Sequence, residues 1–368
     1  MLIKAFLEEI VKRKASDLHI KVGTCPTIRV DGELEALDAP PPSLDEVEAA
    51  CEQILTPKQK KEFEATSEVD FAFGVPGLAR FRANFYRQRG STAMVFRLIP
   101  FDPPRVSELN LPEVISKLAL KPRGLILVTG TVGSGKSTTL AAMIREINDT
   151  QHRNIITVED PIEFLHRDNL SLINQREVGS DTKSFSEALR HILRQDPDVI
   201  LVGEIRDQVT MNIALTAANT GHLVFSTLHT TDAPQTVNRV ISFFPPHQHE
   251  EIRFLLASSL EAIVSLRLVP RSDGEGRVPA TEVMIATETV KEYLTDSDKI
   301  PLLKSVIEES VTEYGMQTFD QSLLEWYNKG AITLEDALHH ASSPTALQIK
   351  AKGIQSGSDV AWTPMGAE

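Results

Sequence analysis

The 368-residue sequence predicts an α/β protein of two domains, a smaller α+β domain followed by a domain with a parallel sheet. The length suits two domains, since a single domain typically holds ~100–200 residues. The second part of the chain contains several nearly continuous apolar runs, and stretches with helical periodicity separate them. Such runs are typical of parallel strands that helices cover on both faces. The runs are residues 125–128, 154–158, 198–205 and 222–228.

The first domain is expected to span residues 1–100, where strand patterns alternate with short helical ones. Its first helix places Phe6 and Leu7 on one apolar face, and we expect this face to pack on its own domain rather than on a membrane. Three prolines within residues 100–105 disfavour both helix and sheet, so a linker is expected at 101–110. The second domain then covers 111–368.

Composition excludes several classes of protein. The net charge of -13 argues against a nucleic-acid coat protein, because such binding depends on basic surface. The two cysteines, Cys25 and Cys51, are too few for a disulfide framework, and they favour a reducing cytosol. The sequence shows neither a signal peptide nor a run approaching the ~20 apolar residues of a membrane span. Any role at a membrane is therefore expected to depend on a partner.

Beyond His229 the sequence predicts mainly helix. The longest candidate runs over residues 247–268, HQHEEIRFLLASSLEAIVSLRL. A β-hairpin is expected next, with its turn at Asp273 and Gly274.

A phosphate-binding loop is predicted directly after the apolar run 125–128. The sequence GTVGSGKS matches the pattern G-x-x-x-x-G-K-[ST] and leads into a helix, which is the context that this motif requires. Its glycines let backbone N–H groups surround phosphate oxygens, its lysine reaches the β- and γ-phosphates, and its serine ligates Mg²⁺. ATP and Mg²⁺ are thus the expected ligands. The residues are Gly130, Thr131, Val132, Gly133, Ser134, Gly135, Lys136 and Ser137, with Thr138 beginning the helix.

Carboxylates follow two of the predicted strands at the same edge of the sheet. Glu204 ends the run 198–205 and can hold Mg²⁺ there, often through water. The segment EDPIEF follows the run 154–158 and adds Glu159, Asp160 and Glu163. Hydrolysis needs a carboxylate to orient or deprotonate the attacking water. Position alone does not separate Glu163 from Glu204 in that role.

Two histidines flank the last apolar run. His229 follows its carboxyl end and can face the γ-phosphate as a sensor, whereas His222 precedes it and is expected to be packed or at a subunit contact. They lie too far apart along a strand to share a metal ion.

Taken together, these motifs resemble the secretion ATPases of type II secretion and type IV pilus systems. The resemblance rests on SDLHIKVGTCPTIRVDGEL and RFRANFYRQRG in the first domain, and on GTVGSGKSTTLAAM, ITVEDPIEF, ILVGEIRD and GHLVFSTLHTTDAP in the second. It implies a PAS-like first domain, a RecA-like second domain and a hexameric motor with ATP between neighbouring domains. It also implies that Glu163 is the catalytic glutamate, that Glu204 serves Mg²⁺ and that Arg82 and Arg97 reach the phosphates. Arg176, Arg190 and Arg194 are weaker candidates.

Within that family the sequence resembles the pilus-retraction branch, because it lacks a long extra N-terminal domain and a four-cysteine zinc site. The resemblance implies a cytoplasmic homohexamer that reaches the inner membrane through a pilus platform protein and binds no nucleic acid. One segment departs from the branch: TETVKEYLTD stands where A-I-R-N-L-I-R-E is usual and retains similar residues only at Val290, Lys291 and Leu294. The alternatives are a paralogous or accessory pilus or secretion ATPase, a RecA-like nucleic-acid motor, and a nucleotide switch that does not hydrolyse ATP.

Overall fold

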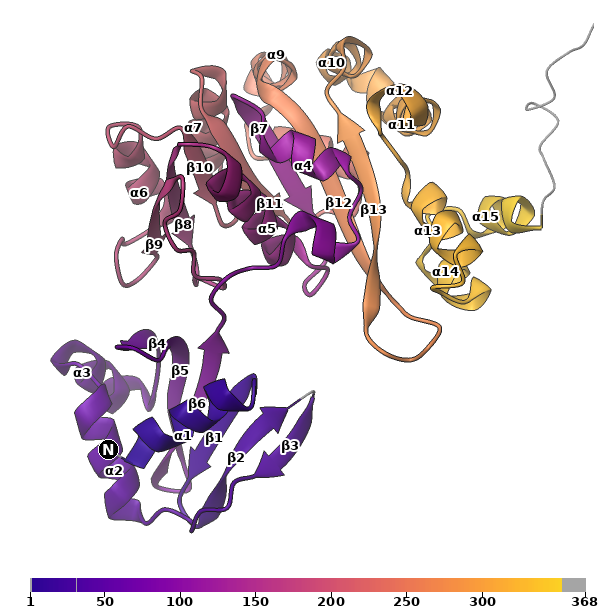
Figure 1. The fold of residues 1–368 in the computed structure, drawn as a ribbon. Coiled ribbons are helices and arrows are strands. Elements are labelled where there is room, and N and C mark those ends of the chain that lie inside the picture. Colours follow the sequence, from indigo (N-terminus) through magenta and orange to yellow (C-terminus); the bar gives the residue numbers. More distant parts are fainter. Residues whose placement is uncertain (1, 31, 353–368) are drawn as a thin grey trace, which may run out of the picture. The chain divides into compact units, whose positions relative to one another are not determined.

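The computed structural model describes residues 2–30 and 32–352 (Figure 1). Contacts within the chain divide it into two compact units. The first contains the residues up to Asp102 together with the short segment Ile162–Leu165, and the second contains Pro103–Pro161 and the chain from His166 onward. The units are described separately below.

The first unit is a six-stranded antiparallel sheet whose strand order is β3-β2-β1-β6-β5-β4. Three helices pack on one face of it (Figure 1). Ile3, Leu7 and Ile10 of the first helix are buried, which confirms that this helix packs on its own domain. The elements are α1 (Leu2–Lys12), β1 (Asp17–Lys21), β2 (Thr24–Val30), β3 (Glu33–Ala36), α2 (Leu44–Ile54), α3 (Pro57–Thr66), β4 (Glu68–Val75), β5 (Ala79–Gln88) and β6 (Ser91–Ile99).

The second unit is built on a seven-stranded sheet with the order β13-β12-β7-β11-β10-β8-β9. All neighbouring strands are parallel except the antiparallel pair at the β13 edge. The strands are β7 (Gly124–Thr129), β8 (Asn154–Glu159), β9 (Leu172–Glu177), β10 (Val199–Val202), β11 (Leu223–Leu228), β12 (Leu260–Pro270) and β13 (Arg277–Ile285).

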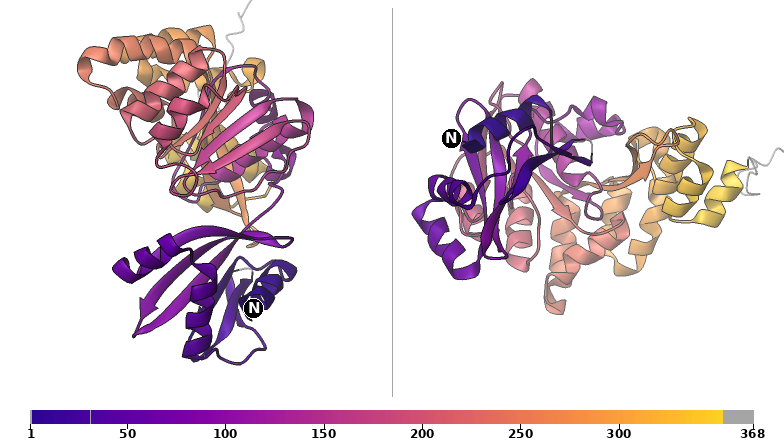
Figure 2. Two further views of the ribbon diagram at one scale, coloured as in Figure 1. Left: turned by 90° about the vertical axis from the view of Figure 1, so that its left-hand side faces the viewer. Right: turned by 90° about the horizontal axis from the view of Figure 1, so that it is seen from below.

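Helices cover both faces of this sheet (Figures 1 and 2). In β7, Leu125 and Leu127 point into one core, and Ile126 and Val128 point into the other. The continuous apolar strand therefore reflects burial on both faces, as the sequence predicted. The α/β fold class is confirmed. The helices up to the last strand are α4 (Val114–Ala119), α5 (Lys136–Thr150), α6 (Phe185–Ile192), α7 (Gln208–Asn219), α8 (Ala233–Ser242) and α9 (His249–Ser259).

The prediction of one long helix over residues 247–268 is wrong. Helix α9 ends at Ser259, and strand β12 begins at Leu260 and pairs with β7 on one side and β13 on the other. Ile263 and Val264 point into opposite cores, so the apolar run is buried on both faces. Periodicity cannot separate such a strand from a buried helix, because both consist of apolar residues throughout.

The predicted hairpin with Asp273 and Gly274 in its turn is confirmed.

Short helices follow the hairpin: α10 (Glu288–Thr295), α11 (Leu303–Glu309), α12 (Val311–Tyr314), α13 (Phe319–Asn328), α14 (Leu334–His340) and α15 (Pro344–Ala351). The last three pack with parts of β12 and β13 around Phe319 in a small core of their own. Within residues 2–30 and 32–352, no helix has the length and apolar character needed to cross a bilayer.

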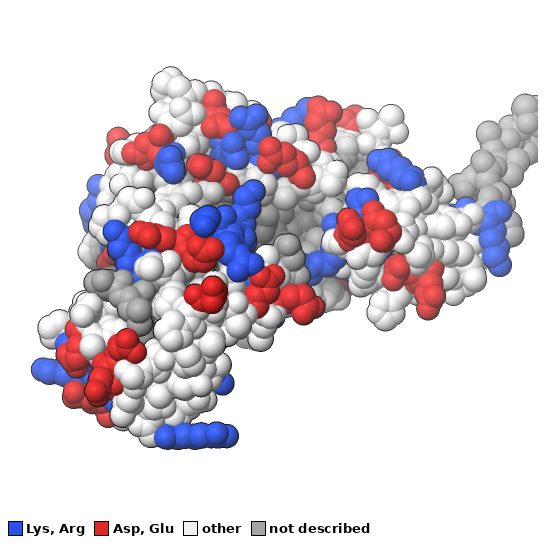
Figure 3. Space-filling model, turned by 60° about the horizontal axis from the view of Figure 1, so that its bottom comes forward, with Lys and Arg blue, Asp and Glu red and all other residues white. Residues whose placement is uncertain are grey.

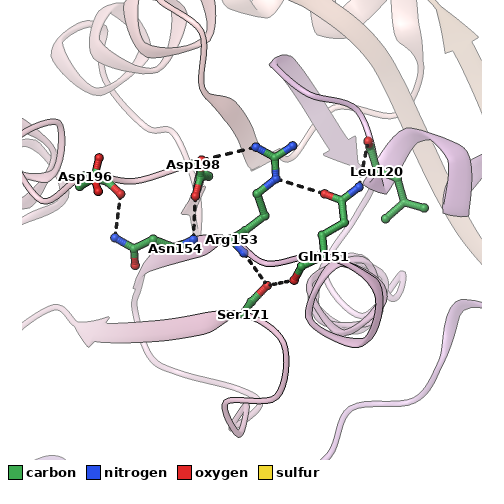
Figure 4. A network of polar contacts seen from close by, with 7 residues as sticks. All are labelled: Leu120, Gln151, Arg153, Asn154, Ser171, Asp196 and Asp198. Carbon is green, nitrogen blue, oxygen red and sulfur yellow. Dashed lines mark hydrogen bonds and ion pairs between the residues drawn. The ribbon is translucent and has the colours of Figure 1, made fainter.

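A polar network joins the loops at the amino-terminal edge of the second sheet (Figure 4). Arg153 lies at its centre: Nε donates to Gln151 Oε1 (3.2 Å), and Nη1 lies 3.4 Å from Asp198 Oδ1. The other oxygen of Asp198 accepts from the Asn154 N–H (2.8 Å). These bonds fix the starts of β8 and β10 relative to each other. The candidate functional site lies at the opposite edge, where the parallel strands end.

Candidate functional site

The phosphate-binding loop follows β7 and runs from Gly130 to Gly135, after which α5 begins at Lys136. Gly130, Gly133 and Gly135 all have positive φ angles, which other residues adopt only with strain. A Cβ atom on Gly130 would lie 2.5 Å from the Leu266 carbonyl oxygen and from Ser134 Oγ, whereas one on Gly133 or Gly135 would meet open space. Gly130 is therefore required by packing against β12 as well as by its backbone conformation.

Lys136 is buried at the start of α5. Its Nζ donates to the carbonyl oxygens of Gly130 (2.9 Å) and Thr131 (2.8 Å), which folds the side chain back over the loop. Ser134 Oγ is buried and has no hydrogen-bond partner within the described part of the chain. An ammonium group, a free hydroxyl donor and the backbone N–H groups of a helix start together make a site suited to phosphate oxygens.

Glu204 and His229 lie together beyond the ends of β10 and β11. Only 15% of the Glu204 side chain is exposed, and its Oε2 lies 3.2 Å from His229 Nε2. Its Oε1 pairs with Arg206, whose Nη1 lies 4.0 Å from Asp160 Oδ2. The structure thus brings Glu204 and His229 together as expected for one sheet edge, and it adds Arg206 and Asp160.

The backbone at Glu204 is held by its neighbouring strands. Thr227 Oγ1 donates to the Gly203 carbonyl (2.7 Å), and Ser226 Oγ donates to the Val202 carbonyl (2.7 Å). A Cβ atom on Gly203 would lie 3.3 Å from the Glu159 Cα atom, so glycine permits β8 to approach closely. Glu204 therefore stands on rigid backbone.

The acids Glu159 and Glu163 of the segment EDPIEF belong to different units. Glu159 Oε1 accepts from Thr157 Oγ1 (2.6 Å) and Gln175 Nε2 (3.2 Å), so it is used within the sheet. Glu163 is exposed. It lies in the segment Ile162–Leu165, which belongs to the first unit: the Leu165 N–H donates to the Pro100 carbonyl (3.1 Å), and Leu165 forms a β-bridge with Phe101. The backbone contacts of its segment therefore assign Glu163 to the first unit, which also contains Arg82 and Arg97, and not to the unit whose strand β8 precedes it.

Arg82 and Arg97 are direct partners on β5 and β6, on the face of the first sheet that the helices leave open. Arg97 Nε donates to Asp17 Oδ1 (2.8 Å). The Asp17 side chain is only 7% exposed and the Arg97 side chain 67%. Arg82 has a looser partner, since its Nη2 lies 3.8 Å from Asp70. Arg97 is therefore anchored through Nε, and its guanidinium remains largely exposed.

The remaining candidates lie elsewhere. Arg176 donates to the Asp181 carbonyl (3.2 Å), and Arg194 donates to the Arg190 carbonyl (3.3 Å) beside α6. His222 Nδ1 lies 3.0 Å from the Ala217 carbonyl at the opposite end of β11 from His229. Among the described residues, no three His, Cys, Asp or Glu side chains form a group that could hold a metal ion.

Sequence reasoning missed three site residues. Arg206 stands two positions after Glu204 in the same motif, and Asp17 is a buried acid beside Leu18 in SDLHI. Glu282 is the single acid within the apolar strand VPATEVMI, and its carboxyl accepts the Ala233 N–H (2.8 Å) just after the loop that carries His229. In the last two cases the signal was a charge inside a buried strand.

Comparisons with known proteins show the family to which the chain belongs. Residues 102–337 match the family model described as type II/IV secretion system protein. The chain is 47% identical over 333 residues to the type IV pilus retraction ATPase PilT of Pseudomonas aeruginosa, covering 90% of this chain and 96% of that one. It is 40% identical over 360 residues to the type IV pilus ATPase PilU of the same organism, covering 98% and 94%. A crystal structure of the pilus retraction motor PilT with bound ADP superposes with a TM-score of 0.87 at 43% identity, covering 94% and 98%.

The crowding at Gly130 predicts unequal effects of alanine in this loop. Gly130→Ala should destabilise the nucleotide-free protein by about 3 kcal/mol or more, because its Cβ would overlap a backbone oxygen. Gly133→Ala should cost only the strain of a left-handed alanine, about 1–2 kcal/mol. Calorimetric unfolding of the two variants measures the difference. Equal losses would show that packing against β12 does not constrain the loop.

Proposed function

The chain belongs to the type II/IV secretion system protein family and is an ATPase of its pilus-retraction branch, and we propose that it works as a homohexameric motor that powers twitching motility. The observation that carries the proposal is the sheet edge itself, where a phosphate-binding loop, Glu204 and His229 end three adjacent parallel strands. Similarity to retraction ATPases over nearly the whole chain supports the same function. Purified protein should hydrolyse ATP and assemble into hexamers, as measured by phosphate release and by mass photometry.

ATP binding is assigned to the loop after β7. Lys136 exchanges the Gly130 and Thr131 carbonyls for β- and γ-phosphate oxygens, and the Ser134 hydroxyl and the loop N–H groups are further donors. Mg²⁺ would be held by the Ser137 hydroxyl, with Glu204 acting through water. A single hydroxyl with phosphates and waters is a donor set that Mg²⁺ prefers. When bound, Mg²⁺ neutralises charge that develops on the phosphate oxygens.

Water activation is assigned to Glu163. It is an exposed carboxylate, and its contacts place it in the unit that also carries Arg82 and Arg97. We propose that these two arginines reach the phosphates of a neighbouring subunit and stabilise the transition-state charge. Hydrolysis would then depend on the arrangement of domains around the ring, and so couple to rotation between them.

Force is proposed to act at the cytoplasmic face of the inner membrane, through a platform protein of the pilus machine. The net charge of -13 and the mixture of basic and acidic side chains on the face in Figure 3 disfavour a nucleic acid as the partner. ATPase activity that rises on addition of DNA would contradict this choice of partner.

A second candidate function, that of a paralogous or accessory pilus ATPase, is favoured by α10. Val290 and Leu294 of this helix are fully buried and serve the core, whereas Lys291 is partly exposed and pairs with Glu288. The departure at Glu292 lies on the exposed face of the helix. A partner would meet that face. Normal pilus retraction in a deletion strain would identify the protein as such a paralogue, and lost retraction would identify it as the main motor.

The two acids predict different kinetic defects. Glu163→Gln should lower kcat by about 100-fold or more with little change in ATP affinity, because it removes the base that positions water. Glu204→Gln should instead raise the Mg²⁺ concentration needed for half-maximal activity. Steady-state hydrolysis over a range of Mg²⁺ and ATP concentrations distinguishes them. The reverse pattern would exchange the two roles.

The anchoring of Arg97 predicts that Asp17 supports hydrolysis. Asp17→Ala should lower kcat by about tenfold and couple to Arg97→Ala by about 1 kcal/mol or more, because both changes remove the same oriented guanidinium. Asp70→Ala is the matched control, since its pair with Arg82 is longer and exposed. The measurement is a double-mutant cycle on kcat, with unfolding followed in parallel. Additive effects of Asp17→Ala and Arg97→Ala would contradict the prediction.

A further inference from the structure

Glu282 is a buried acid that the hydrolytic mechanism above does not use. It lies in β13 between Thr281 and Val283, and 3% of the residue is exposed. Burial raises the pKa of its carboxyl to about 7, and the negative charge of Asp232 adds to this rise. Burial of an ionisable group costs free energy, so a buried acid at this position indicates that its carboxyl makes a compensating interaction.

The carboxyl of Glu282 holds the end of the loop that carries His229. Its Oε1 accepts the backbone N–H of Ala233 (2.8 Å), the first residue of α8. The loop is also tied internally, since Thr230 Oγ1 lies 2.7 Å from Thr236 Oγ1, and Thr236 Oγ1 donates to the Asp232 carbonyl (2.7 Å). His229 at the other end of the loop lies against Glu204. The histidine loop, residues 229–232, is thus fixed at both ends.

The residues of β12 beside Glu282 also support the phosphate-binding loop. Glu282 is the direct partner of Ser265 on β12. Ser265 Oγ accepts from Thr129 Oγ1 (2.9 Å), and Thr129 immediately precedes Gly130. The next residue, Leu266, has the carbonyl oxygen that a side chain on Gly130 would meet. Glu282 therefore links the histidine loop to the strand pair behind the phosphates.

We propose that Glu282 is a positioning residue of the ATPase site, whose carboxyl holds the histidine loop and thereby places His229 at the nucleotide. The inference rests on the proposed ATPase function and on the role expected from the sequence for His229, that of a sensor facing the γ-phosphate. It concerns only the second unit of one subunit, so it does not depend on the hexamer.

Nearby charges act on the ionisation of Glu282 in both directions: Asp232 opposes it, and Arg267 and Lys304 favour it. The charged groups that act on it are Asp232, the N-cap residue of α8, Arg267 from β12 and Lys304 from α11. With Glu282 ionised, two negative and two positive groups balance. An ionised carboxyl also makes a stronger bond to the Ala233 N–H, because the amino end of α8 carries partial positive charge.

Two substitutions separate the hydrogen bond from the charge. Glu282→Gln keeps an acceptor for the Ala233 N–H but cannot ionise, and Glu282→Leu removes the acceptor. We expect the kcat of the wild-type protein to rise severalfold between pH 6 and pH 8, with a midpoint at about 7. Glu282→Gln should lack that rise at every ATP concentration. Glu282→Leu should lose about tenfold or more in kcat at all pH values, with ADP affinity changed by less than about threefold.

Thermal stability gives a second readout, and its dependence on pH has the opposite sign to that of kcat: it should fall, not rise, as the pH increases. Because the pKa of Glu282 is raised in the folded protein, the folded state binds more protons than the unfolded state between pH ~4.5 and ~7. Its contribution to stability is therefore present below pH ~4.5 and lost as the pH rises through about 7. Glu282→Gln should abolish this loss, so its melting temperature should exceed that of the wild-type protein most at pH 8.

Glu325→Gln makes the same chemical change on the exposed side of α13, where Glu325 pairs with Lys329, and should leave both profiles as in the wild-type protein. An unchanged pH profile of kcat in Glu282→Gln would overturn the inference, as would full activity in a folded Glu282→Leu protein. If Glu282→Leu fails to fold, the Glu282→Gln profiles still decide. A wild-type protein that does not hydrolyse ATP would contradict the proposed function instead.

Discussion

Parallel pairing of β7, β11, β10 and β8 is the constraint on which the site depends. Strands that run side by side in the same direction must all end at one edge, and each strand here is followed by a residue of the site. Gly130 follows β7, His229 follows β11 and Glu204 follows β10 at a distance of two residues. At the other edge, the bonds of Arg153 and Asp198 hold the same strands by their starts. The chemistry is thus positioned by backbone pairing, and each loop only has to supply a side chain.

Glu163 is the exception, and its position explains how hydrolysis could be made conditional. It follows β8 in sequence, but the bonds of Leu165 to Pro100 and Phe101 place it in the first unit. A glutamate on the same rigid body as the phosphate loop would act whenever ATP is bound. Under the mechanism that we propose, a glutamate grouped with Arg82 and Arg97 would act only when the domains are suitably arranged. A motor needs this dependence, because a turnover that is independent of domain arrangement produces no force.

The sequence was informative where chemistry is local and uninformative where it depends on pairing between distant segments. The positions of the phosphate loop, Glu204 and His229 at one sheet edge could be predicted because each lies within two residues of the end of an apolar strand. Strand β12 could not, because its apolar run matches a buried helix equally well, and only pairing with β7 and β13 decides between them. Asp17 and Glu282 share this difficulty. Their partners, Arg97 and Ala233, lie 80 and 49 residues away, and no local pattern indicates either contact.

The folded-back position of Lys136 shows how this edge accommodates the change in charge on binding ATP. Its ammonium group donates to two carbonyl oxygens, which are neutral acceptors that phosphate oxygens can replace. A carboxylate partner there would compete with the phosphates for the same charge and weaken binding. Neutral carbonyls compete less, because they lack the charge–charge attraction that phosphate oxygens have for the ammonium group. Glu204 is meanwhile paired with Arg206 and His229 rather than with the lysine. The two loop carbonyls thus hold the ammonium group near the place where a nucleotide brings phosphate oxygens, and these supply the negative charge that carbonyls lack.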